Sequence, residues 1–131
     1  MSYQVGDKEF DAVIGLPGPD RYGYFIKRVA DTEEVWGLRD DDGWASLGDD
    51  SGQASFPVWP HPRFAEALAT DEWASYRAAA IPLSSWLEDW LPGLEEDGLQ
   101  IAVFPTPAGQ GVVVSCKELE AHLENELEDY E

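Results

Sequence analysis

Few side chains in the sequence could carry catalysis: it has two histidines and one cysteine in 131 residues. His61 lies between Pro60 and Pro62, at a junction where a strand is expected to give way to a helix. A rigid imidazole could act as a general acid or base near neutral pH. His61 therefore supports one hypothesis, a small enzyme or ligand-binding domain with a pocket near this residue. The simpler interpretation is a structural residue at the junction.

His122 has Glu118 and Glu126 four residues away on either side. The three side chains would share one face of a helix and could bind a divalent metal. The sequence lacks an HExxH motif, so a solvated helix face is the favoured interpretation. We expect no metal site, no cofactor and no catalytic residue.

Cys116 is the only cysteine, which excludes an internal disulfide and is typical of a reducing compartment. It follows Ser115 at the expected start of a helix, where the helix dipole could lower its pKa. Acidic neighbours would oppose formation of the thiolate. Ser115 as a helix cap is a sufficient explanation for the site.

Two acidic clusters separate short apolar runs. Asp40–Asp42 precede Gly43, and Asp49–Asp50 precede Ser51 and Gly52. Both lack the alternating ligands and final glutamate of a calcium-binding loop. Asp and Gly favour chain reversals, so both clusters are predicted to be turns.

The six tryptophans exceed what a core of this size needs. One or two of them could be exposed in a rim with Tyr22 and Phe56, which would indicate a protein-binding surface because aromatic residues dominate interface energetics. A role in the core is equally compatible with the pattern. The candidate partner-binding residues are Asp40, Asp41, Asp42, Asp49, Asp50, Trp44, Trp59 and His61.

The segment 33–63 organises the predicted fold. Its apolar runs between the two turns predict three short strands in a β-meander. The runs 101–104 and 112–115 predict a β-hairpin, with cover on both faces.

Helices are predicted at five places around these strands. The first two are expected to be capped by Asp7 and Asp20, and the second to turn Arg21 away from the core. The third begins at Pro62. The fourth starts with a capping box at Ser85, and Pro92 should stop or kink it, whereas the last is capped by Ser115. The prediction is one α+β domain over residues 1–131, with an antiparallel sheet of about five strands (meander plus hairpin) and several short helices.

The formal net charge of -19, from 27 acidic and 8 basic residues, excludes some partners. Such a charge repels nucleic acid and anionic membranes and accelerates encounter with a basic protein. The sequence contains no apolar run of membrane-spanning length, and residues 1–10 lack the pattern of a signal peptide. We therefore expect a cytoplasmic protein.

Several segments resemble a known family in order along the chain: RYGYFIKRVADTEEVWGLRDDDGW, PVWPHP followed by FAEAL, IPLSSWLEDWLPGL, and IAVFPTP. The chain is similar to the bacterial domain-of-unknown-function family 2750, from about Phe10 to the C-terminus. That family implies no catalytic residues. A fainter likeness is to the SseB-type domain associated with secretion systems. It depends on Gly52 and the run 57–59, and the segment 60–62 departs from that pattern.

Together these features favour a non-enzymatic, acidic cytoplasmic protein-binding module, and its concrete version is an immunity or inhibitor protein for a basic bacterial toxin or nuclease. One alternative is the small enzyme or ligand-binding domain near His61. A second alternative is a self-associating structural subunit that extends a sheet through the 101–115 hairpin.

Overall fold

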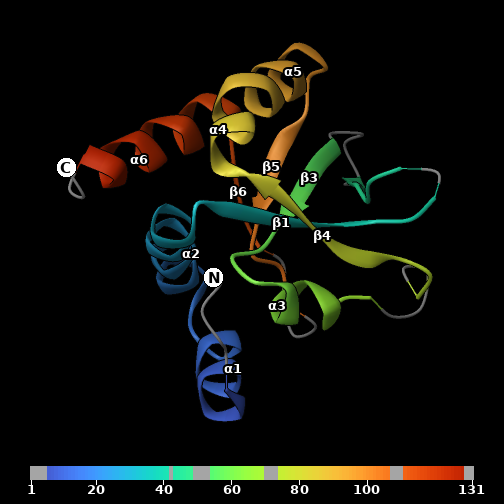
Figure 1. The fold of residues 1–131 in the computed structure, drawn as a ribbon, viewed down its shortest axis with the longest axis vertical. Helices are drawn as coiled ribbons and strands as arrows, with labels where there is room; N and C mark the ends of the chain where they lie inside the picture. Colours follow the sequence, from blue (N-terminus) through green and yellow to red (C-terminus); the bar gives the residue numbers. More distant parts are fainter. Residues whose placement is uncertain (1–5, 42, 49–53, 70–73, 107–110, 129–131) are drawn as a thin grey trace.

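The computed structural model describes residues 6–41, 43–48, 54–69, 74–106 and 111–128. Figure 1 shows a sheet-centred α+β fold with helices around it. The elements in chain order are α1 (Asp7–Ile14), α2 (Gly18–Thr32), β1 (Glu34–Arg39), β2 (Leu47–Gly48), β3 (Ala54–Val58), α3 (Pro62–Glu66), β4 (Arg77–Pro82), α4 (Leu83–Ser85), the π-helical turn η2 (Trp86–Trp90), α5 (Leu91–Glu96), β5 (Gln100–Val103), β6 (Val112–Val114) and α6 (Cys116–Glu128).

The strands form two small sheets within the described residues. One is the antiparallel pair β1–β4, and the other has the order β2-β3-β5-β6. Paired backbone hydrogen bonds between Trp36 and Trp59, of 2.9 and 2.8 Å, connect β1 to the end of β3. This bridge joins the two sheets at one place, and in Figure 1 β1 and β4 run across the direction of β3 and β5.

The predicted all-antiparallel sheet is wrong, because β3 and β5 pair in parallel. Parallel neighbours need a long crossover connection, and α3, β4 and the helical segment 83–96 supply it. The near-continuous burial of β3 and β5 is the pattern of strands covered on both faces.

The meander is confirmed only in part. β2 pairs with β3 as predicted, but β1 approaches the next run only through a bridge between Arg39 and Trp44. Instead β1 pairs over six residues with β4, of which only Ile81 and Pro82 were predicted to be extended. The hairpin of β5 and β6 is confirmed, although Val113 is 49% exposed.

The helical segment 83–96 passes through Pro92 without stopping. The N–H of Leu91 bonds to the carbonyl of Trp86, five residues back, so the turn before the proline is π-helical. Pro92 lies inside this continuous helix, because Trp90 and Leu91 before it are themselves helical, and the π-helical turn is where the helix accommodates the missing N–H. The predicted capping box at Ser85 is not formed, because the helix already begins after Pro82.

The N-terminal helices begin earlier than predicted. Gly6 and Pro17 take the N-cap positions in place of Asp7 and Asp20. Asp7 instead pairs with Arg63 at 2.6 Å.

Arg21 faces the core and is buried, contrary to the prediction. Its guanidinium donates to the carbonyls of Leu16 and Phe104. Phe104 has a positive φ of 61°, so the arginine holds a strained turn after β5. Predicted features at α3 and α6 are confirmed, with Pro62 in the first turn of α3 and Ser115 accepting from the Glu118 N–H at 3.1 Å. None of the helices in the described part of the chain has the length and apolar character needed to cross a membrane.

Candidate functional site

An aromatic cluster joins the turn after β1 to the helical segment 83–96. The ring of Trp44 meets that of Trp90 edge to face, with centroids 5.0 Å apart. Phe56 lies against both rings, and Trp86 stacks on Trp90 at 6.3 Å. Phe56 and Trp86 are buried, whereas Trp44 and Trp90 are half-buried. The cluster thus has a buried base and two rings that reach the surface.

A pocket of about 330 Å³ opens beside this cluster. We call it the Trp90 pocket; its lining residues are Asp89, Trp90, Gly93, Leu94 and Asp97. Asp89, Gly93 and Asp97 are spaced four residues apart, so they follow one face of the helix. Because Gly93 has no side chain, space remains between the two carboxylates: an added Cβ there would meet nothing within 4 Å.

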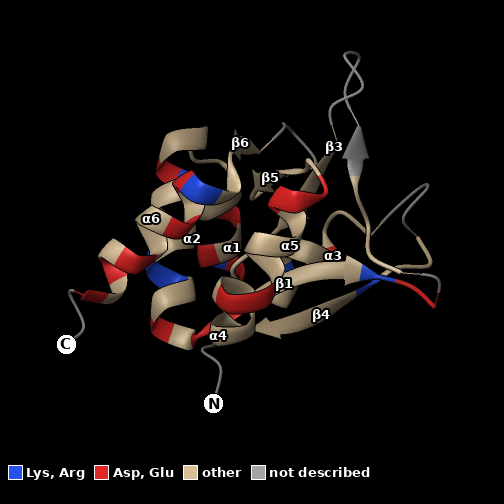
Figure 2. Ribbon diagram, turned by 90° about the horizontal axis from the view of Figure 1, so that it is seen from above, with Lys and Arg blue, Asp and Glu red and all other residues tan. Residues whose placement is uncertain are grey.

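The chemistry of this pocket suits a cation. The aromatic ring attracts a cation through its quadrupole, and exposed Asp89 and Asp97 can accept charge-assisted hydrogen bonds. A lysine or arginine side chain combines the needed charge, donors and apolar stem. Figure 2 shows acidic residues along the segment 83–96 and along α6, with few basic ones nearby.

Of the candidate residues predicted from the sequence, Trp44 lies beside the Trp90 pocket, but none of them lines it. Trp44 touches Trp90, and Arg39 lies over the Trp44 ring at 5.3 Å. The i, i+4, i+8 spacing around Gly93 was the available signal for the two carboxylates. On its own this spacing is equally typical of an ordinary solvent-exposed helix face, so it does not identify a pocket.

The two described acidic candidates lie in an ordinary turn. Asp40 Oδ1 accepts from the N–H of Gly43 at 3.0 Å, as expected of a turn residue. Asp41 is 96% exposed and lies 3.6 Å from Arg77, on β4. Asp42, Asp49 and Asp50 lie outside the described residues, as does Trp73.

Trp59 and His61 are not brought to the Trp90 pocket. Trp59 is fully buried, and its indole N–H donates to the carbonyl of Pro105 at 2.8 Å. His61 is the N-cap of α3, where its Nδ1 accepts from the Arg63 N–H at 3.1 Å. This capping bond fits the structural interpretation of His61.

A second pocket, of about 250 Å³, lies between α2 and α6. We call it the Tyr22 pocket, lined by Tyr22, Gly23, Ile26, Lys27, His122, Asn125 and Glu126. The Tyr22 hydroxyl lies 2.5 Å from His122 Nδ1. Burial, followed by the charge of Glu118, raises the pKa of Tyr22 to about 12, so its hydroxyl stays protonated. The tautomer of His122 sets which of the two groups donates in this hydrogen bond.

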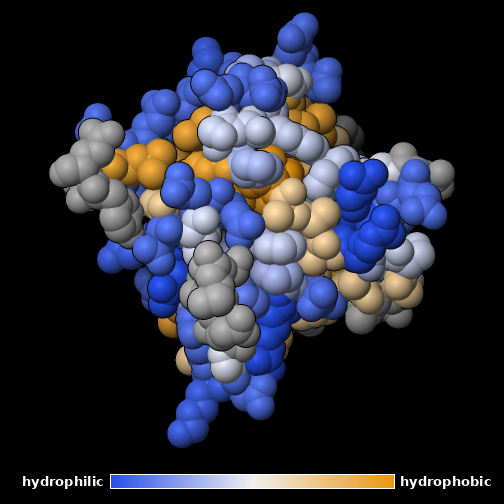
Figure 3. Space-filling view, in the orientation of Figure 1, coloured by the Kyte–Doolittle hydropathy of each residue, from blue (hydrophilic) through white to orange (hydrophobic). Residues whose placement is uncertain are grey.

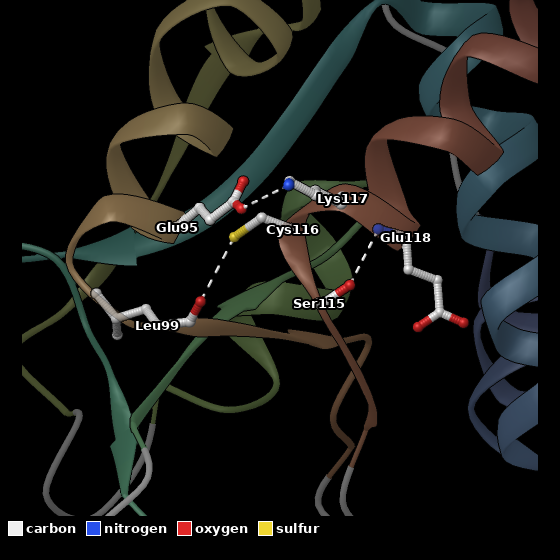
Figure 4. Close-up of polar contacts among 6 residues, drawn as sticks. All are labelled: Glu95, Leu99, Ser115, Cys116, Lys117 and Glu118. Carbon is white, nitrogen blue, oxygen red and sulfur yellow. Dashed lines mark hydrogen bonds and ion pairs between the residues drawn. The ribbon is translucent and has the colours of Figure 1, made fainter.

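The described residues contain no group of three or more His, Cys, Asp or Glu side chains that could hold a metal ion. Cys116 is buried, and its thiol donates to the carbonyl of Leu99 at 3.4 Å (Figure 4). Burial, followed by the charge of Glu95, raises the pKa of this thiol. The same view shows Glu95 paired with Lys117 at 3.5 Å. Cys116 is thus a packed core thiol in an environment that disfavours the thiolate.

Comparison with known proteins gives a family without a known activity. A family model described as "Protein of unknown function (DUF2750)" matches residues 22–123. The comparison with curated proteins found no match. Among solved structures, the chain is similar to one titled "Anabaena Tic22 (protein transport)", with 18% identity and a TM-score of 0.40. That alignment covers 65% of this chain and 47% of the other, so the chain spans about half the length of that structure.

Proposed function

The chain belongs to the DUF2750 family, and from that premise we propose that it is a non-enzymatic cytoplasmic module that binds a basic protein through the Trp90 pocket. The concrete version is an immunity or inhibitor protein for a basic toxin or nuclease. The observation that supports the proposal is the placement of two exposed carboxylates and a half-buried indole around one open pocket.

The pocket would hold one lysine or arginine side chain of the partner. A cation over an exposed aromatic ring is stabilised by about 0.5–1 kcal/mol, and tryptophan is the best such ring. Tryptophan and arginine are also the residues most often found at interface hot spots.

The rest of the molecule would assist association. A net charge of -19 attracts a basic protein over distance and raises the association rate at low ionic strength. The same charge opposes binding of this chain to nucleic acid. Nucleic acid would instead compete with this chain for a basic toxin or nuclease.

The test is affinity capture with the tagged full chain from its host lysate at low salt, followed by mass spectrometry. We expect a basic protein that raised salt releases. The double variant Asp89→Asn/Asp97→Asn should weaken its retention about tenfold, if each exposed carboxylate contributes about 0.5–1 kcal/mol.

The matched control is Glu124→Gln/Glu128→Gln, which removes the same charge from exposed positions of α6. This variant should retain the partner like the parent chain. Equal losses in both variants would show that total charge matters and the Trp90 pocket does not.

A second candidate function is a small-ligand site in the Tyr22 pocket. It is favoured by the hydrogen-bonded Tyr22 and His122 beside Lys27, because these groups offer donors and an acid–base pair to a small anion. Citrate and inorganic phosphate are suitable first probes. Shifts of the His122 ring signals in NMR on titration would support this candidate, and unchanged signals at millimolar probe would remove it.

A further inference from the structure

The strand β4 lies at the outer edge of the sheet. Within the described residues it pairs only with β1. In Figure 2 it is the outermost strand on the side that faces the viewer in Figure 1, and the surface around its position in Figure 3 is mixed, with weakly hydrophobic atoms beside strongly hydrophilic ones. Within the part of the chain that the structure describes, this edge of the sheet therefore carries no further strand.

The register shows which backbone groups point outward from β4. Leu83 donates its N–H to the carbonyl of Glu33, which identifies that pair as a hydrogen-bonded one. Antiparallel pairs alternate between hydrogen-bonded and non-bonded. Ala79 therefore bonds to Gly37, whereas Ala80 opposite Trp36 does not bond to β1.

Backbone hydrogen bonds on the other side of β1 confirm this alternation of bonded and non-bonded pairs. The backbone N–H and C=O of Trp36 both bond to Trp59, and the carbonyl of Leu38 accepts from the N–H of Ala45. The backbone polar groups of Trp36 and Leu38 therefore point away from β4. Their partners in register are Ala80 and Ala78. The N–H and C=O groups of these two alanines consequently point out of the sheet.

Little on β4 blocks this edge. No backbone partner for the outward groups of Ala78 and Ala80 lies within the described part of the chain. Proteins usually guard open edges with lysine, proline or a bulge. On β4 the residues that would discourage pairing lie at the two ends of the strand. They are Pro82 at one end and Arg77, with its partner Asp41, at the other.

We propose that the β4 edge binds an extended basic segment of the partner protein by strand addition, with the outward groups of Ala78 and Ala80 forming the ladder. This inference depends on the proposed function for the charge of its occupant. A second copy of the chain would bring another charge of -19 to the same edge, whereas a basic segment is attracted.

The experiment titrates the full chain with a ten-residue peptide of alternating valine and lysine. We expect the amide proton signals of Ala78 and Ala80 to shift downfield and their hydrogen exchange to slow at least tenfold. The amide of Ala79, already bonded to β1, should change little. The same peptide with N-methyl groups on alternate residues should bind at least tenfold more weakly, because it cannot complete the ladder.

Two variants locate the effect. Ala80→Pro removes the outward N–H while leaving the bonds to β1, and edge positions of this kind tolerate proline. It should weaken peptide binding at least tenfold, whereas Ala80→Ser should not. If neither Ala80→Pro nor N-methylation of the peptide weakens peptide binding, the proposal is overturned.

Two further outcomes separate this inference from the proposed function. If the peptide binds the edge but Asp89→Asn/Asp97→Asn leaves capture of the basic partner unchanged, the Trp90 pocket fails and the strand-addition site stands. If the free chain sediments as a dimer that Ala80→Pro dissociates, the occupant is a second copy and the proposal of a basic segment is overturned.

Discussion

Gly93 lines the Trp90 pocket without contributing a side chain to it. Its added Cβ would meet nothing within 4 Å, and the surrounding backbone is helical. Gly93→Ala should raise the free energy of unfolding by about 1 kcal/mol, because alanine loses less conformational entropy in a helix. Gly93→Leu should fold equally well but fill the pocket and prevent binding of the basic partner.

Denaturant unfolding and the capture assay test the two halves of this prediction. Ala121→Leu on α6 is the matched control, since this exposed helical position lines neither the Trp90 pocket nor the Tyr22 pocket. Partner binding that survives Gly93→Leu would remove the pocket from the interface.

Tyr22 predicts a pH dependence in the alkaline range. Its pKa rises from 10.0 to about 12 in the folded chain, so the unfolded chain loses this proton first. The contribution of Tyr22 to stability is complete below pH 10 and is lost between about pH 10 and pH 12. Thermal unfolding of Tyr22→Phe should show a shallower fall in Tm over this range than the parent chain, and parallel curves would refute the assignment.

At the scale of elements, the β5–β6 hairpin depends on a backbone contact. A Cβ on Gly111 would lie 2.4 Å from the carbonyl oxygen of Val103 and 2.9 Å from the nitrogen of Pro105. Neither backbone atom can move without disturbing β5. Gly111→Ala should therefore lower the free energy of unfolding by about 1–3 kcal/mol, as expected for overpacking.

Urea unfolding measures this loss, and Gly98→Ala is an informative comparison. Gly98 has open space but a positive φ of 79°, so its substitution is destabilising through backbone strain alone. An unchanged unfolding midpoint for Gly111→Ala would show that the hairpin can relax.

The π-helical turn is the element that prepares the candidate site. It takes the helix past Pro92 and stacks Trp86 on Trp90, so that one ring is buried and its neighbour reaches the pocket. π-helical turns of this kind are frequent at functional sites.

For the molecule as a whole, charge is the dominant feature. With 27 acidic and 8 basic residues, the folded chain concentrates like charges that the unfolded chain separates. Added salt screens this repulsion, with a Debye length of about 10 Å at 0.1 M. The Tm should rise as sodium chloride is increased from about 10 to about 300 mM, and a constant or falling Tm in calorimetry would show that the repulsion is already compensated.

The local features of this protein were determined by the sequence itself. The cap at Ser115, Pro62 in the first turn of α3 and the turn at Asp40 depend on hydrogen bonds and dihedral preferences within a few residues. The packed face of α6, with Leu119 and Leu123 buried, likewise follows from helical spacing.

Only the tertiary structure decided the features that depend on distant segments. β4 has alanines with weak strand preference and becomes a strand because β1 offers it a partner. The parallel pairing of β3 with β5, the burial of Arg21 and the contact of Trp44 with Trp90 all join residues far apart in the chain. Burial and long-range pairing outweigh local preference at these positions, and the Trp90 pocket and the β4 edge are products of that packing.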